Sequence, residues 1–163
     1  MPSKIIESKI APREIAKYFL LRASKDGDLI SPLKMQKLVY FAYALYLVRA
    51  KGKKKLFEES IEAWPAGPVI PSLYRELKKY GSMPINPAIY VDIAEEDFAT
   101  RYSKEIVETL NDVYESCEKY TPFELMVLSH KERAWFKARK GLAPNEQTNN
   151  ILKDDDILEQ HLK

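Results

Sequence analysis

The stretch "LKMQKLVYFAYALYLV" (Leu33 to Val48) decides the fold, because it carries no charged residue after Lys37. Its apolar residues recur at helical spacing and occupy nearly all sides of the helix that they predict. In a soluble chain such a helix lies at the centre of the core, since every side needs to be covered. Ser31 and Pro32 precede it, a pair typical of an N-cap followed by proline at the first helical position. We therefore expect a bundle around a central apolar helix over about residues 32–50.

Further helices are predicted on both sides of the central one. Pro12 marks the start of a first helix that ends near Ser24. "TPFE" (Thr121 to Glu124) is a capping box, in which both polar side chains satisfy free N–H groups at a helix start. Helical spacing of apolar residues predicts another helix over 103–120, with Cys117 facing the core. The remaining helices are expected at 72–80, directly after Pro71, within "ERAWFKARKG" up to about Gly141, and in the polar segment that closes the sequence.

The β structure is expected to be small. "SIEAW" (residues 60–64) alternates enough to be a short strand, and prolines at 65, 68 and 71 argue against its continuing through a central sheet position. The apolar stretch Ala88 to Ile93 lies just beyond two prolines, and we interpret it as a second strand near a sheet edge that pairs with the first. The fold class is mainly α with a small β element (α+β). It is a compact single-domain helical bundle over residues 1–163, with a short two-stranded β hairpin-like piece.

Composition limits the classes of function. The 163 residues are 45% hydrophobic, which suits one continuous core. Lys and Arg number 26 against 24 Asp and Glu, far from the basicity of a dedicated nucleic-acid-binding protein. Cys117 is the one cysteine, so an internal disulfide is impossible and a thiolate zinc site lacks ligands. The first nine residues lack the apolar core of a secretory signal, and we expect a cytoplasmic protein without membrane contact.

Residues suited to catalysis are few. The two histidines are His130 and His161, and His161 is close enough to the end of the sequence that we expect it to fray. Ser129 and His130 resemble the start of a nucleophile pair, but neighbours on a helix point about 100° apart, so a cap or a buried hydrogen bond is favoured for His130. The acidic run at 154–156 lacks calcium-loop spacing and suits the start of a helix, and no glycine-rich phosphate loop is present. We expect no enzyme, no metal and no cofactor.

The segment "EAWPAGPVIPSLYRELKKYG" (residues 62–81) supports two interpretations of its tryptophan. In the structural one, Trp64 packs against the core, and Gly67 allows a turn that a side chain would strain. In the functional one, a proline-stiffened turn presents aromatic side chains to a partner without a further cost of ordering the loop. The candidate partner-binding residues are Trp64, Pro65, Val69, Tyr74 and Tyr80.

Three stretches carry a resemblance to a known family: "LKMQKLVYFAYALYLV", "LFEESIEAWPAGPVIPSLYRELKKYG" and "LMVLSHKERAWFKAR". Together they resemble the Panacea domain family, a bacterial and phage-associated group that includes antitoxins of two-gene toxin–antitoxin systems. The family motif maps onto Leu38, Tyr40, Trp64, Gly67, Pro68, Val69, His130 and Trp135. Two departures are Ala66, where many relatives have a larger residue, and "RAW", which replaces a proline-tryptophan pair.

The resemblance implies a mostly helical domain that neutralises a toxin from a neighbouring gene by direct protein–protein binding. Some relatives act as adaptors that deliver the bound toxin to an ATP-dependent protease, which is the first alternative. A DNA-binding regulator of its own operon, using the lysines at 51–55 and 78–79, is the second. A hydrolase built around His130 is the weakest. The oligomeric state and the identity of the toxin stay open.

Overall fold

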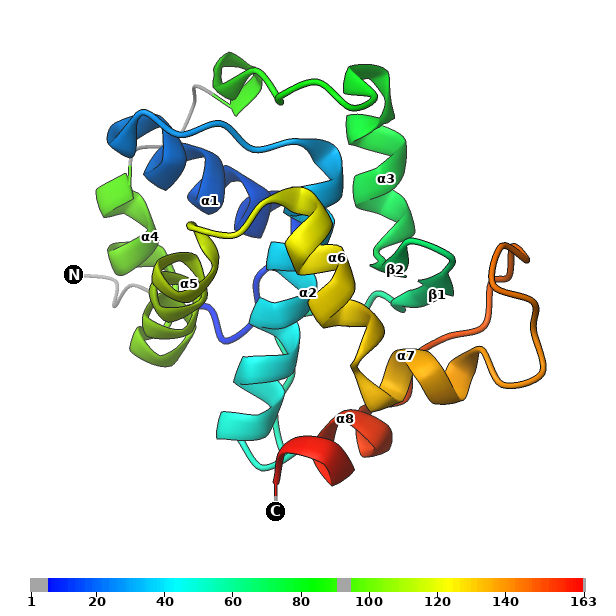
Figure 1. The fold of residues 1–163 in the computed structure, drawn as a ribbon. Coiled ribbons are helices and arrows are strands. Elements are labelled where there is room, and N and C mark those ends of the chain that lie inside the picture. The colour runs from blue at the N-terminus through cyan, green and yellow to red at the C-terminus, as the bar shows by residue number, and fades with distance from the viewer. Residues whose placement is uncertain (1–5, 91–94, 163) are drawn as a thin grey trace.

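The computed structural model describes residues 6–90 and 95–162, which form a helical bundle with a small hairpin on one side (Figure 1). The helices are α1 (Pro12–Asp26), α2 (Pro32–Arg49), α3 (Pro71–Leu77), α4 (Glu95–Arg101), α5 (Lys104–Cys117), α6 (Pro122–His130), α7 (Arg133–Ala138) and α8 (Asp154–His161). The strands are β1 (Glu62–Trp64) and β2 (Gly67–Val69), and two short 3-10 helices, η1 (Lys78–Tyr80) and η2 (Pro87–Tyr90), complete the described elements. The predicted fold class is confirmed.

Helix α2 runs through the middle of the bundle, as its apolar sequence predicts (Figure 1). Helices α1, α5, α6 and α8 all pack against it. Leu38, Val39 and Tyr40 have at most 1% of their surface exposed, and Phe19 of α1 and Leu110 of α5 are equally buried. Burial of this kind stabilises the fold by about 25 cal/mol per Å² of apolar surface removed from water.

The predicted helix starts are confirmed by their hydrogen bonds. The Ser31 side chain accepts a hydrogen bond from the backbone N–H of Lys34, and Pro32 is the first residue of α2. Thr121 and Glu124 form the complete capping box of α6, with both reciprocal bonds at 3.1 Å. Proline also opens α1 and α3. Helix α4 was not predicted.

The second strand was predicted in the wrong place. Residues 87–90 form η2, and 91–93 lie outside the described residues. The partner of β1 is β2, only two residues further along the chain, with Trp64 opposite Gly67 and Ala63 opposite Pro68. The Ala63 N–H points away from β2 to the Asn150 carbonyl, so this pair is not hydrogen-bonded across the ladder. Pro68 therefore lacks its N–H at a position where the ladder does not use one.

Within the residues that the structure describes, no helix is both long enough and apolar enough to cross a membrane.

Candidate functional site

The hairpin is hydrogen-bonded to the helices through its backbone carbonyl groups. Two of the donors come from α7 and the turn after it. The Trp135 indole Nε1 donates to the Trp64 carbonyl at 2.8 Å, and Arg139 Nη1 donates to the Ala63 carbonyl at 2.7 Å. The other terminal nitrogen of Arg139 donates to carbonyls of the following loop, including that of Ala143 at 2.9 Å. These bonds join β1 to the loop that leads towards α8.

Helix α2 supplies the donors for β2. Lys37 Nζ donates to the Pro68 carbonyl at 3.0 Å. Gln36 uses both ends of its amide on Ile70, donating to its carbonyl at 3.2 Å and accepting from its N–H at 2.8 Å. Both side chains are buried within a helix that is otherwise apolar there. They therefore satisfy backbone groups that would be costly to bury alone.

Lys37 is an unusual residue for this position, because its side chain is completely buried. Burial disfavours the charged ammonium and lowers the pKa of Lys37 to about 7, and no acid among the described residues offsets the effect. A buried cation without an anionic partner costs free energy of folding. The hydrogen bond to Pro68 thus comes at an energetic cost that an apolar residue would avoid.

Position 67 requires glycine for two reasons, its backbone conformation and the lack of room for a Cβ atom. Its φ of +113° lies in a region that favours glycine. A Cβ at this position would come within 2.5 Å of Ser129 Oγ and 2.9 Å of Lys37 Nζ. The glycine thus lets β2 approach α6 and α2 closely, as the structural interpretation of the turn predicts.

His130 has a structural role at the hairpin. Its Nε2 lies 3.0 Å from the Pro65 carbonyl, and its ring stacks on Trp135 with 4.2 Å between ring centroids. A carbonyl only accepts, so Nε2 carries the proton. Partial burial lowers the pKa of His130, an effect that the Pro65 carbonyl opposes and the charges of Lys37 and Arg139 reinforce. The predicted hydrogen-bonding role is confirmed, and Ser129 beside it donates to the Met126 carbonyl.

The residues on the outer face of the hairpin differ in how far they are exposed to solvent. Trp64 and Pro65 are half-buried, and Ala66 at the tip of the turn is exposed. The Trp64 ring meets the exposed Tyr74 ring edge-on at 4.7 Å, and its Nε1 donates to Glu62 at 2.9 Å. Trp64 thus packs against Tyr74 of α3, and it is not among the partly buried side chains that pack against the core cluster of the described residues.

Two of the candidate contact residues do not join that surface. Val69 is only 5% exposed and packs inward, so we leave it out of the contact face. Tyr80 is half-buried in η1, where Lys79 lies over its ring. The motif residues Leu38, Tyr40 and Pro68 are buried and belong to the interior.

A second polar cluster was missed by the sequence analysis. The Tyr40 hydroxyl donates to the buried Glu132 carboxylate at 2.7 Å. The Gln160 amide donates to the same carboxylate at 3.3 Å, and His161 Nε2 lies 3.1 Å from it. Burial and the adjacent Glu132 raise the pKa of Tyr40 well above its usual value. The expectation that His161 frays is wrong, because this cluster holds the end of α8 against α2.

The acidic run of α8 is less solvated than predicted. Asp154 accepts a hydrogen bond from the buried Tyr43 hydroxyl at 2.7 Å, and Asp156 pairs with Lys137 at 3.2 Å. These contacts dock α8 on α2 and α7. The run does open a helix, as expected from the favourable position of acids there.

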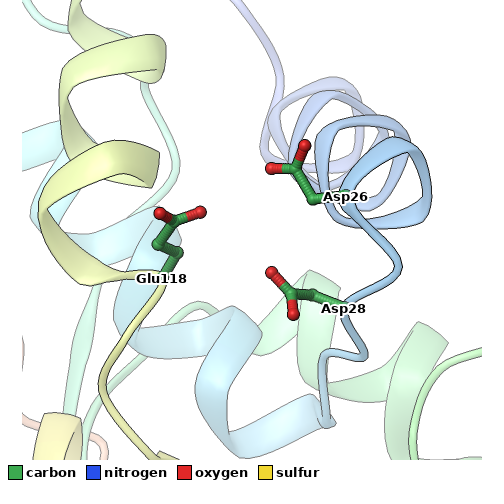
Figure 2. A group of neighbouring side chains, drawn as sticks. All are labelled: Asp26, Asp28 and Glu118. Carbon is green, nitrogen blue, oxygen red and sulfur yellow. The ribbon is translucent and has the colours of Figure 1, made fainter.

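Figure 2 shows a separate group of carboxylates, Asp26, Asp28 and Glu118, whose oxygens lie within 4.8 Å of one another. All three side chains are exposed, and the Tyr114 hydroxyl donates to Asp26 at 3.0 Å. Exposed acids of this kind are common on protein surfaces, and we assign no metal to them.

The lysines after α2 do not form an isolated basic patch. Lys55 pairs with Glu58 at 3.3 Å, while Lys53 and Lys54 line a hollow together with carboxylates of α5. The positive charge at this end of α2 is therefore offset locally, which weakens the interpretation as a phosphate-binding surface.

Known proteins are similar to this chain in sequence. Residues 35–136 match the family described as "Antitoxin SocA-like, Panacea domain". A relative, Antitoxin SocA from Caulobacter vibrioides (strain NA1000 / CB15N), is 42% identical over 82 residues, which is 50% of this chain and 43% of that protein. The chain thus matches less than half the length of that relative. No solved structure matches.

Proposed function

Because the chain belongs to the SocA-like Panacea domain family of antitoxins, we propose that it neutralises a toxic protein, encoded by a neighbouring gene, by binding it directly. The hairpin and the adjoining helix α3 present the contact face, which we define as Trp64, Pro65, Ala66 and Tyr74. The observation that carries this assignment is the set of backbone hydrogen bonds that hold the hairpin. A loop that is ordered before binding loses little further conformational entropy when a partner docks.

The composition of the contact face also supports the proposal. Tryptophan and tyrosine are frequent binding hot spots, and here the two rings form a T-shaped pair with 4.7 Å between their centroids. Tyr74 is 43% exposed, so part of it is available to a partner. The family motif residues around this face, Gly67, His130 and Trp135, act from beneath it.

Co-expression with the adjacent gene tests the proposal. We expect the neighbour to arrest growth alone, this protein to restore growth, and the two to copurify as a stable complex. Tyr74→Ala should weaken the complex by about tenfold or more, as expected of a hot-spot side chain. Phe123→Ala is the matched control, since Phe123 is a similarly large side chain, 66% exposed, on α6. A harmless neighbour that does not bind would overturn the proposal.

A further inference from the structure

A groove of about 410 Å³ lies along the central helix. Its lining residues come from α2, from α5, from Glu132 just before α7 and from His161 at the end of α8. Helix α2 forms the floor with Phe41, Ala44, Leu45 and Val48, and Val113 and Cys117 of α5 form the apolar part of the wall.

The floor is an incompletely covered stripe of α2. Phe41, Leu45 and Val48 follow the i, i+4, i+7 spacing of one helix face and are half-buried, whereas Leu38 and Leu47 are almost fully covered. At 1.5 Å per residue the stripe is about 10 Å long, or two turns. An apolar strip of this length beside a second helix matches the shape that an amphipathic helix fills.

The charge around the groove selects the kind of helix. Asp112 and Glu132 line the groove, together with His161, and among the described residues no lysine or arginine lines it. Of the acids of α5, Asp112 lines the groove, whereas Glu105 and Glu108 line another hollow beside Lys53 and Lys54. Arg49 pairs with Asp112 at 2.7 Å and offsets part of this charge. The carboxylates of the described groove lining, Asp112 and Glu132, therefore favour a basic ligand.

We propose that this groove binds an amphipathic helix of the partner protein, with its apolar face on the α2 stripe and basic side chains towards α5. Only the identity of the partner rests on the function proposed above. The chemistry of the groove rests on the stripe and the acidic wall, and it is tested without the partner.

Two synthetic helices of about 18 residues, long enough to fold when stapled, serve as probes of the groove. Both carry the same leucine stripe, and one has lysine flanks where the other has glutamate. Cys117 lines the groove and is the sole cysteine of the chain, so its rate of modification by a maleimide reports on occupancy. We expect the lysine helix to bind about tenfold tighter or more than the glutamate helix and to protect Cys117. Equal binding of the two helices, or no protection, would overturn the inference.

Variants locate the binding on the protein. Leu45→Glu places a charge on the stripe, and Ser116→Arg, at an exposed lining residue, adds bulk and the wrong charge. Either should abolish binding of the lysine helix, and Ser116→Arg keeps the test decisive if Leu45→Glu fails to fold. Leu29→Glu is the control, because Leu29 is 67% exposed outside the groove. Unchanged binding by a folded groove variant would refute the assignment.

The adjacent gene product separates the two proposals. If it binds and protects Cys117, both stand. If it binds and leaves Cys117 as reactive as in the free protein, the groove assignment fails while the proposed function stands. If it does not bind, the proposed function fails, and the synthetic helices still decide the chemistry of the groove.

Discussion

Replacing Lys37 by methionine should change the pH dependence of stability. Methionine has a similar length and shape but carries no charge. In the folded protein burial lowers the pKa of Lys37 to about 7, whereas in the unfolded chain the lysine titrates at its ordinary value of 10.5. Between these values the unfolded state binds more protons, so the stability of the wild-type protein rises with pH. The contribution is present above pH 10.5 and is lost as the pH falls towards 7.

The size of the effect follows from the two pKa values. One unit of pKa corresponds to about 1.4 kcal/mol, and integration between pH 7 and pH 9 gives a gain of about 2 kcal/mol for the lysine. The methionine variant lacks this gain. It also leaves the Pro68 carbonyl without its donor, at a cost of about 1–3 kcal/mol that does not depend on pH. The difference in stability between the two proteins should therefore move by about 2 kcal/mol in favour of lysine between pH 7 and pH 9.

Guanidinium unfolding curves at both pH values measure this difference directly. Burial raises the pKa values of Cys117 and of several tyrosines, including Tyr43 and Tyr114, so these groups act on stability at higher pH. Their effect is common to both proteins and cancels in the comparison. Lys140→Met, at an exposed lysine, is the control and should show no such change. If the stability difference between wild type and Lys37→Met is the same at pH 7 and pH 9, the reasoning that Lys37 is buried without a compensating charge is refuted.

Three further predictions concern the hairpin and its donors. Gly67→Ala should destabilise the fold by at least about 2 kcal/mol in denaturant unfolding, because it combines a positive φ with a clash against Ser129, and a loss below 0.5 kcal/mol would contradict this. Trp135→Phe keeps most of the stacking on His130 but removes the indole donor from the Trp64 carbonyl, which keeps its ladder partner Gly67, so we expect a loss of about 0.5–1.5 kcal/mol and faster amide exchange in the hairpin. Because the pKa of His130 is lowered in the folded state, its contribution is present above pH 6.5 and lost as the pH falls below it. His130→Gln should therefore flatten the acid side of the stability profile, and an unchanged slope would argue against this role.

The central helix and most helix starts could be predicted because they depend on local features. Capping boxes, prolines at the first helical position and the uncharged run after Lys37 act within a few residues of one another. The misplaced strand has a different cause. Pro68 is harmless in β2 because of its register against Ala63, and register depends on contacts that a linear pattern does not contain.

The candidate site was only partly predictable for the same reason. Tyr74 was expected as a contact residue and Trp64 either in the core or in a contact face, and the structure places their rings together. The donors Gln36, Lys37 and Arg139 were missed, although two polar residues within an apolar helix do signal buried hydrogen bonds. The groove was missed because α2 is apolar on nearly all sides. The sequence does not say which side its neighbours leave uncovered.

The hairpin is held through main-chain atoms, so its side chains can change while the bonds that hold it stay in place. A carbonyl oxygen is present whatever the side chain, so the bonds from Arg139, Trp135 and His130 survive substitution at the residues whose carbonyls they reach. The conformation of the loop therefore does not depend on which side chains stand at the tip of the hairpin. New side chains at Pro65 and Ala66 can be sampled on an unchanged loop, much as antibody loops vary on a constant framework.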